Sequence, residues 1–130
     1  MTNPRQAGRR STDKPGLFSR GSVVLVTLNT PREKFWGGLL ELTPAGITLR
    51  GIDLNSLEDF ARQVKSGEAV SPGAVFFPMH RVERMELDAR NGDIPSLCER
   101  FFAKTNREFS EFVASEPEAG SRAAAPERRR

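Results

Sequence analysis

The stretch AVFFPMHRVERMELD, at residues 74–88, constrains the fold most because its alternation of apolar and polar residues breaks in the middle. Phe77 belongs to one alternating series and Val82 to the opposite one. A regular strand keeps its apolar residues on one face, and Pro78 has no backbone N–H to donate to a sheet. The pattern therefore predicts a strand at 74–77, a tight turn at 78–80 and a second strand at 81–88.

Three more short strands are expected upstream. SVVLVTLN, at residues 22–29, begins apolar on both faces, which favours a buried strand. Two β-rich runs, 35–42 and 47–54, flank the turn-forming sequence Thr-Pro-Ala-Gly and predict a hairpin. Gly37 and Gly38 interrupt the first run, and glycine inside a strand is typical of a bulge or sharp bend. A strongly bent second strand suits a small closed barrel.

A helix is predicted at about 57–65, inserted before the fourth strand. Its apolar residues recur at the spacing of one helix face, namely Leu57, Phe60, Ala61 and Val64. Ser56, followed three residues later by Asp59, has the spacing of a capping box. We therefore expect this helix to begin at that box and to pack on the barrel through its apolar stripe.

A second, amphipathic helix is predicted near the C-terminal end, at about 96–114. Ser96 and Glu99 have the spacing of a capping box, which marks its start. Four phenylalanines recur on one expected side, namely Phe101, Phe102, Phe109 and Phe112. This apolar side must be buried, either against the barrel or against another subunit.

The charge of the chain lies in its two ends. Residues 1–16 carry a net charge of +3, residues 115–130 carry +1, and residues 17–114 carry −1. The ends are rich in Pro, Gly, Ser and Ala and lack apolar periodicity, so we expect disordered tails around a single domain. Basic tails hold polyanions non-specifically or simply keep a protein soluble. The tail arginines that would contact RNA are Arg9, Arg10, Arg128, Arg129 and Arg130.

Several classes of protein are disfavoured by what the sequence lacks. No run approaches the roughly 18 apolar residues of a membrane span, and the N-terminus lacks the apolar core of a secretory signal, so a soluble, cytoplasmic protein is expected. One cysteine and one histidine leave no internal disulfide and no zinc set. Without a phosphate-binding loop or a nucleophile elbow, we expect a non-enzyme that needs no cofactor.

Two segments resemble the Sm-like family, which includes the bacterial RNA chaperone Hfq. GSVVLVTLNTPREKFWGGLLELTPAGITLRG, at 21–51, resembles the first Sm motif, and MHRVE, at 79–83, resembles the second motif of Hfq. The resemblance covers about 60 of the 130 residues and rests mostly on apolar spacing. It implies a mainly β fold with helices: a small five-stranded barrel with the inserted helix before strand 4 and the C-terminal helix. An unrelated SH3-like barrel would have the same strand count.

The family resemblance also implies an RNA pocket, whose residues are largely replaced here. Where Hfq has an aromatic residue and a glutamine, this chain has Ala45 and Gly46, and where Hfq has a tyrosine and a lysine it has Pro78 and Met79. Only His80 matches. Without a stacking ring or base-edge hydrogen bonds, sequence-selective RNA binding has no carrier.

His80 has two interpretations at the corner between the last two strands. It either contacts RNA, with Arg81 and Arg84 adding positive charge, or holds the turn by bonding a backbone carbonyl. We favour the structural role.

Two functions remain open. The first is a ring-forming Sm-like homo-oligomer, of about six or seven protomers as the family implies, whose copies associate through strand edges or the phenylalanine-rich helix. It would bind RNA loosely through its tails and this corner. The second is a protein-interaction or assembly module on an SH3-like barrel with no nucleic-acid role.

Overall fold

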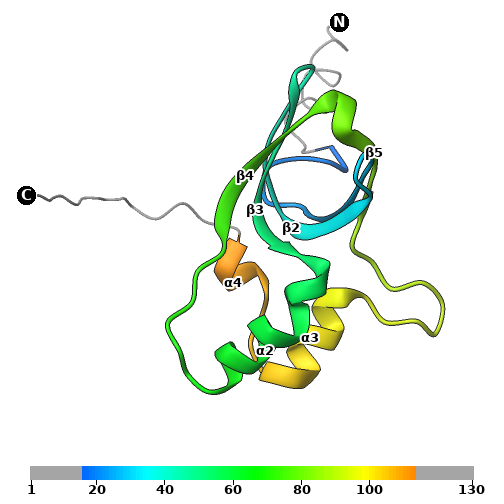
Figure 1. The fold of residues 1–130 in the computed structure, drawn as a ribbon. Coiled ribbons are helices and arrows are strands. Elements are labelled where there is room, and N and C mark those ends of the chain that lie inside the picture. Colours follow the sequence, from blue (N-terminus) through cyan, green and yellow to red (C-terminus); the bar gives the residue numbers. More distant parts are fainter. Residues whose placement is uncertain (1–15, 114–130) are drawn as a thin grey trace, which may run out of the picture.

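The computed structural model describes residues 16–113, as five strands with helices (Figure 1). The elements follow in the order β1 (Val23–Leu28), β2 (Glu33–Thr43), β3 (Gly46–Asp53), η1 (Leu54–Ser56), α2 (Leu57–Lys65), β4 (Gly73–Pro78), η2 (Met79–Arg81), β5 (Val82–Leu87), α3 (Leu97–Thr105) and α4 (Ser110–Val113). The expected combination of β-strands and helices is confirmed. Most of the predicted tails, with Arg9, Arg10, Arg128, Arg129 and Arg130, lies outside the described residues.

All five strands form one antiparallel sheet in the order β4-β3-β2-β1-β5. The predicted break in the apolar run is confirmed, because β4 ends at Pro78 and β5 begins at Val82 after one turn of 3-10 helix. Although β4 and β5 follow one another in the chain, they lie at opposite edges of the curved sheet (Figure 1). The two edge strands are therefore the strands on either side of the predicted turn at 78–80.

The concave face of the sheet carries one hydrophobic core. Alternate residues of the strands point into it, as the period of two requires. Its fully or nearly buried members are Val24, Val26, Leu28, Leu39, Ile47, Leu49 and Phe77. Every strand except β5 supplies one of these residues, and β5 adds partly buried Met85 and Leu87. This core is what curls the sheet.

The opposite face of the sheet carries a second core, which the three α-helices cover. The predicted stripe of α2 is buried here, since Leu57, Phe60, Ala61 and Val64 are its buried residues. Trp36 of β2 is fully buried among the helices and stacks on Phe109 with ring centroids 3.5 Å apart. Trp36 is therefore a central contact between the helical layer and the sheet.

The predicted single helix at 96–114 is wrong, because the chain forms two separate helices there. Asn106 adopts a left-handed conformation with φ of 63° and ends α3, a position that asparagine tolerates well. The Thr105 hydroxyl donates to the Phe101 carbonyl and accepts from the Arg107 N–H, which fixes the break. The break brings Phe109 onto Trp36, whereas Phe102 remains 42% exposed.

Two of the strand glycines allow backbones to approach one another, and they do not form the predicted bulge. Gly37 and Gly51 face each other across β2 and β3, and a Cβ on Gly37 would lie 2.5 Å from the Arg50 carbonyl oxygen. The irregularity of β2 lies slightly later, between Leu39 and Glu41. Gly37 and Gly51 thus mark a close approach of two strands, and the bulge expected at Gly37 and Gly38 lies just beyond them.

The predicted capping box of α2 is also absent, since the Ser56 side chain makes no capping hydrogen bond. Asp53 instead accepts a 2.7 Å hydrogen bond from the Asn55 N–H and caps η1, which leads directly into α2. The 3-10 turn shifts the cap from Ser56 to Asp53.

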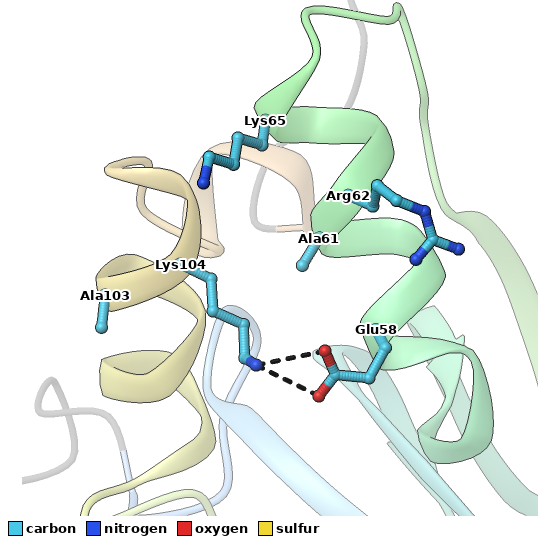
Figure 2. Close-up of a pocket in the computed structure, with 6 residues that line it drawn as sticks. All are labelled: Glu58, Ala61, Arg62, Lys65, Ala103 and Lys104. Atoms are coloured by element: carbon cyan, nitrogen blue, oxygen red, sulfur yellow. Dashed lines mark hydrogen bonds and ion pairs between the residues drawn. The ribbon is translucent and has the colours of Figure 1, made fainter.

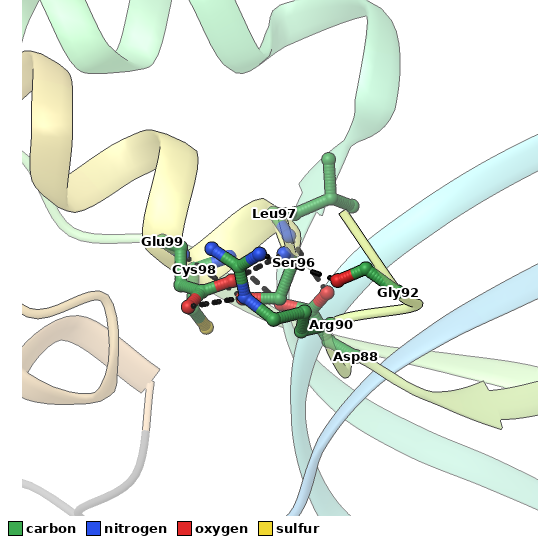
Figure 3. A network of polar contacts seen from close by, with 7 residues as sticks. All are labelled: Asp88, Arg90, Gly92, Ser96, Leu97, Cys98 and Glu99. Atoms are coloured by element: carbon green, nitrogen blue, oxygen red, sulfur yellow. Dashed lines mark hydrogen bonds and ion pairs between the residues drawn. The ribbon is translucent and has the colours of Figure 1, made fainter. Parts of the chain in front are cut away.

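Asp88 joins the sheet to the start of α3 (Figure 3). Its Oδ1 accepts from the Leu97 N–H at 2.8 Å, and its Oδ2 accepts from the Cys98 N–H at 2.8 Å and from the Trp36 Nε1–H at 3.1 Å. A carboxylate at a helix N-terminus satisfies free N–H groups and interacts favourably with the helix dipole. One side chain after β5 therefore anchors both α3 and the buried indole.

The predicted capping box at the start of α3 is confirmed. The Ser96 Oγ accepts from the Glu99 N–H at 3.0 Å, and the Glu99 carboxylate accepts from the Ser96 N–H at 2.7 Å. This backbone N–H, helped by the guanidinium of Arg90, holds the pKa of Glu99 below its ordinary value. The start of α3 is thus fixed by two carboxylates.

Replacing Asp88 tests this anchor. Asp88→Asn puts an amide NH₂ where an acceptor is needed, and we expect the free energy of unfolding to fall by about 2–3 kcal/mol because hydrogen bonds to a charged group are lost. Denaturant unfolding followed by tryptophan fluorescence measures this change. Asp93→Asn, an exposed position in the same loop, is the matched control and should change stability by less than about 0.5 kcal/mol. Equal effects of the two changes would contradict the anchor.

Candidate functional site

The corner between β4 and β5 is held by Arg81. Its guanidinium donates to the Asn29 carbonyl at 2.7 Å, to the Pro31 carbonyl at 3.0 Å and to the Glu33 carboxylate at 2.8 Å. The side chain is only 20% exposed. Two of these acceptors lie in the turn between β1 and β2 and the third is the first residue of β2, so Arg81 connects this turn to the distant turn η2.

His80 lies beside this network but contributes only its backbone. Its carbonyl accepts a 3.4 Å hydrogen bond from the Asn29 side-chain amide, and the residue is exposed. Among residues 16–113, no hydrogen bond of the His80 imidazole is found. The turn is therefore stabilised by Arg81, and the structural role that the sequence suggested for His80 belongs to its neighbour. This role of Arg81 could not be read from the sequence, since its acceptors lie 48 to 52 residues away.

The remaining cation of the predicted RNA-binding corner is also paired. Arg84 forms a salt bridge with Glu86 at 2.9 Å, and nearby Arg32 pairs with Glu83 at 3.3 Å. Exposed pairs of this kind contribute little to stability, but they neutralise charge where a phosphate would bind. The structure thus brings His80, Arg81 and Arg84 together at one corner without making it a concentrated positive surface.

A groove of about 290 Å³ lies between α2 and α3 (Figure 2). Its lining residues are Glu58, Ala61, Arg62, Lys65, Ala103 and Lys104. The Lys104 ammonium donates to both oxygens of Glu58 at 3.1 Å, and Arg62 pairs with Asp59. Most of its charged lining is therefore engaged in ion pairs, and the Lys104–Glu58 pair links the two helices. The lining holds no nucleophile with a neighbouring base, which leaves the groove a binding surface at most.

Cys98 is the one thiol of the chain, and its surroundings disfavour the reactive thiolate. Burial, together with the nearby Asp88 carboxylate, raises the pKa of the Cys98 thiol far above its ordinary value. A nucleophilic cysteine needs the opposite environment. Across residues 16–113, no group of three or more His, Cys, Asp or Glu side chains is placed to hold a metal ion.

Membrane-spanning helices are not found in the described part of the chain, where every helix is too short or too polar to cross a bilayer.

The two edge strands are the other candidate interface. In residues 16–113, β4 pairs only with β3, and β5 pairs only with β1. Phe76 on β4 is 52% exposed, although a large aromatic side chain is usually buried. The sequence analysis expected association through strand edges but did not single out β4 or Phe76. A usable signal was the absence of charge from residues 69–79.

Comparison of the chain with models of known families, with curated proteins and with solved structures finds no match.

The Arg81 network yields a stability prediction. Arg81→Ala removes three hydrogen bonds from a charged, mostly buried donor, so we expect the free energy of unfolding to fall by about 2–3 kcal/mol. Arg84→Ala and His80→Ala remove exposed side chains and should each cost less than about 0.5 kcal/mol. Urea unfolding of the three variants measures the difference. A large loss for His80→Ala with none for Arg81→Ala would show that the wrong side chain was assigned.

The environment of Cys98 yields a prediction of reactivity. Because a raised pKa leaves little thiolate near neutral pH, the native thiol should react with iodoacetamide at pH 8 at least about tenfold more slowly than the unfolded chain. Mass spectrometry of samples quenched over time, with and without guanidinium chloride, gives both rates. Equal rates would mean that the thiol is neither shielded nor held neutral.

Proposed function

We propose that this chain is a non-catalytic assembly module, a small Sm-like barrel that self-associates through the edges of its sheet. The observation that carries the proposal is the pair of edge strands, β4 and β5, which have backbone groups available for a further strand in the described part of the chain. Five strands, a second strand with a register irregularity and the three-residue η2 turn support the barrel assignment. Unpaired edges are a general route to association between chains.

The two cores explain why assembly would use edges. The concave face of the sheet is filled by one core, and the opposite face is covered by the α-helices through Trp36. Neither core offers an accessible site for chemistry. The groove between α2 and α3 is bordered by ion pairs, and the lone thiol is disfavoured as a nucleophile. Binding through exposed strands is the activity that this arrangement best supports.

RNA binding through the tails is a second candidate, favoured by the distribution of charge. The tails hold the net positive charge, whereas residues 17–114 are slightly negative and the corner arginines are paired. RNA would therefore be held loosely by Arg9, Arg10, Arg128, Arg129 and Arg130, and not by His80, Arg81 and Arg84. Such binding is non-specific and weakens steeply with salt.

Light scattering over a concentration series tests the assembly proposal. We expect the full-length chain to have a mass above that of one chain, increasing with concentration as association proceeds. A mass of one chain at every concentration would overturn self-association. If such a monomer still captured another protein, the remaining explanation would be an SH3-like interaction module.

Gel shifts with single-stranded RNA at low and high salt test the second candidate. Replacing the five tail arginines with alanine should abolish the low-salt shift, because the counterion-releasing contacts are lost. The control is the double variant His80→Ala with Arg84→Ala, which should bind RNA as the unchanged chain does. The reverse outcome would place RNA at the corner, and no shift in any sample would exclude the candidate.

A further inference from the structure

The two edge strands differ in charge. β4 contains no charged residue, and its charge-free surroundings run from residue 69 to residue 79. β5 carries Glu83, Arg84 and Glu86. Charged side chains on an edge strand oppose pairing with another chain, because pairing would bring them beside apolar residues and remove water. The edge of β4 lacks this protection.

The side chains of β4 alternate between the concave core and the outside. Phe77 is 7% exposed and packs in the core, whereas Phe76, opposite Thr48 of β3, is 52% exposed on the other side. The Phe76 ring lies over Gly46, since a Cβ on that glycine would lie 2.6 Å from the ring. β4 thus carries an exposed aromatic ring on the outer face of the sheet, where it leans over β3.

We propose that two copies of this chain pair through their β4 edges, antiparallel about a twofold axis, to form one continuous sheet. The inference rests on the proposed self-association and names its surface and partner. Directly opposite residues of antiparallel strands point to the same side of a sheet. If the concave faces of both copies lie on the same side of the joined sheet, Phe76 can lie opposite Phe76 of the second copy. Val75 then lies opposite Phe77 of that copy.

Charge selects this pairing over the head-to-tail alternative. Two β4 strands meet without any charged side chain, whereas β4 against β5 would place Glu83, Arg84 and Glu86 beside an uncharged strand. A twofold contact uses the same patch on both copies and closes at two, while a head-to-tail contact continues into a ring or a filament. Pro78 ends the strand and has no N–H to donate, so the pairing is confined to the six residues of β4.

Disulfide trapping tests the register in a Cys98→Ala background, which removes the natural thiol. Opposite residues in antiparallel strands have Cα atoms about 4.5–5.5 Å apart, within the range that a disulfide bridges. Phe76→Cys should therefore form a covalent dimer under mild oxidation, whereas Arg84→Cys on β5 should not. An equal mixture of the two variants should give only the Phe76→Cys homodimer. A mixed disulfide between them would overturn the twofold pairing in favour of a head-to-tail contact.

Two lysine substitutions test the proposed β4 contact without a cross-link. Phe76→Lys puts two like charges at the centre of the proposed contact, and we expect the dimer dissociation constant to rise at least about tenfold. Phe102→Lys is the control, since Phe102 is a comparably exposed phenylalanine, 42%, on α3. Light scattering measures association, and circular dichroism shows that both variants fold.

The outcomes separate the two proposals. Loss of association for Phe76→Lys alone supports the β4 contact. If Phe76→Lys associates as the unchanged chain does, the β4 contact is overturned while self-association stands. If the unchanged chain is a monomer at every concentration, self-association itself fails, and the β4 contact fails with it.

Discussion

The carboxylate of Asp88 is the interaction on which the arrangement of sheet and helices depends. It lies just after the last strand, yet it accepts hydrogen bonds from two N–H groups at the start of α3 and from the buried indole of Trp36. The indole in turn stacks on Phe109, which follows the break after α3. One acidic group thus fixes the direction of α3, and the position of α4 follows from it.

Several features that depend on neighbouring residues were predictable from the sequence, whereas the contacts between distant residues were not. The break at Pro78, the stripe of α2 and the capping box at Ser96 each rest on residues within one turn or one strand. Arg81 could not be identified as the residue that holds its corner, because its acceptors lie about 50 residues away. The break at Asn106 was missed because the phenylalanine spacing continues across it.

The candidate site was predicted less well than the fold, and the reason is electrostatic. Sequence shows which charged residues lie at the corner, but only the structure shows that Arg81 is bound to Glu33 and Arg84 to Glu86. A basic composition indicates a polyanion only where the charges are unpaired. In this chain the excess of positive charge belongs to the tails, so it carries no information about the folded domain.

Within residues 16–113 both faces of the sheet are covered, so its edges are where the sheet can still gain backbone hydrogen bonds. Curvature toward the concave core and coverage by α2, α3 and α4 use the two faces. Edge pairing therefore adds contacts without displacing any contact that holds the domain together. β5 carries charged side chains and β4 carries none, so the two edges are not equally suited to pairing. This difference favours a contact between the β4 edges of two copies over a contact between β4 and β5.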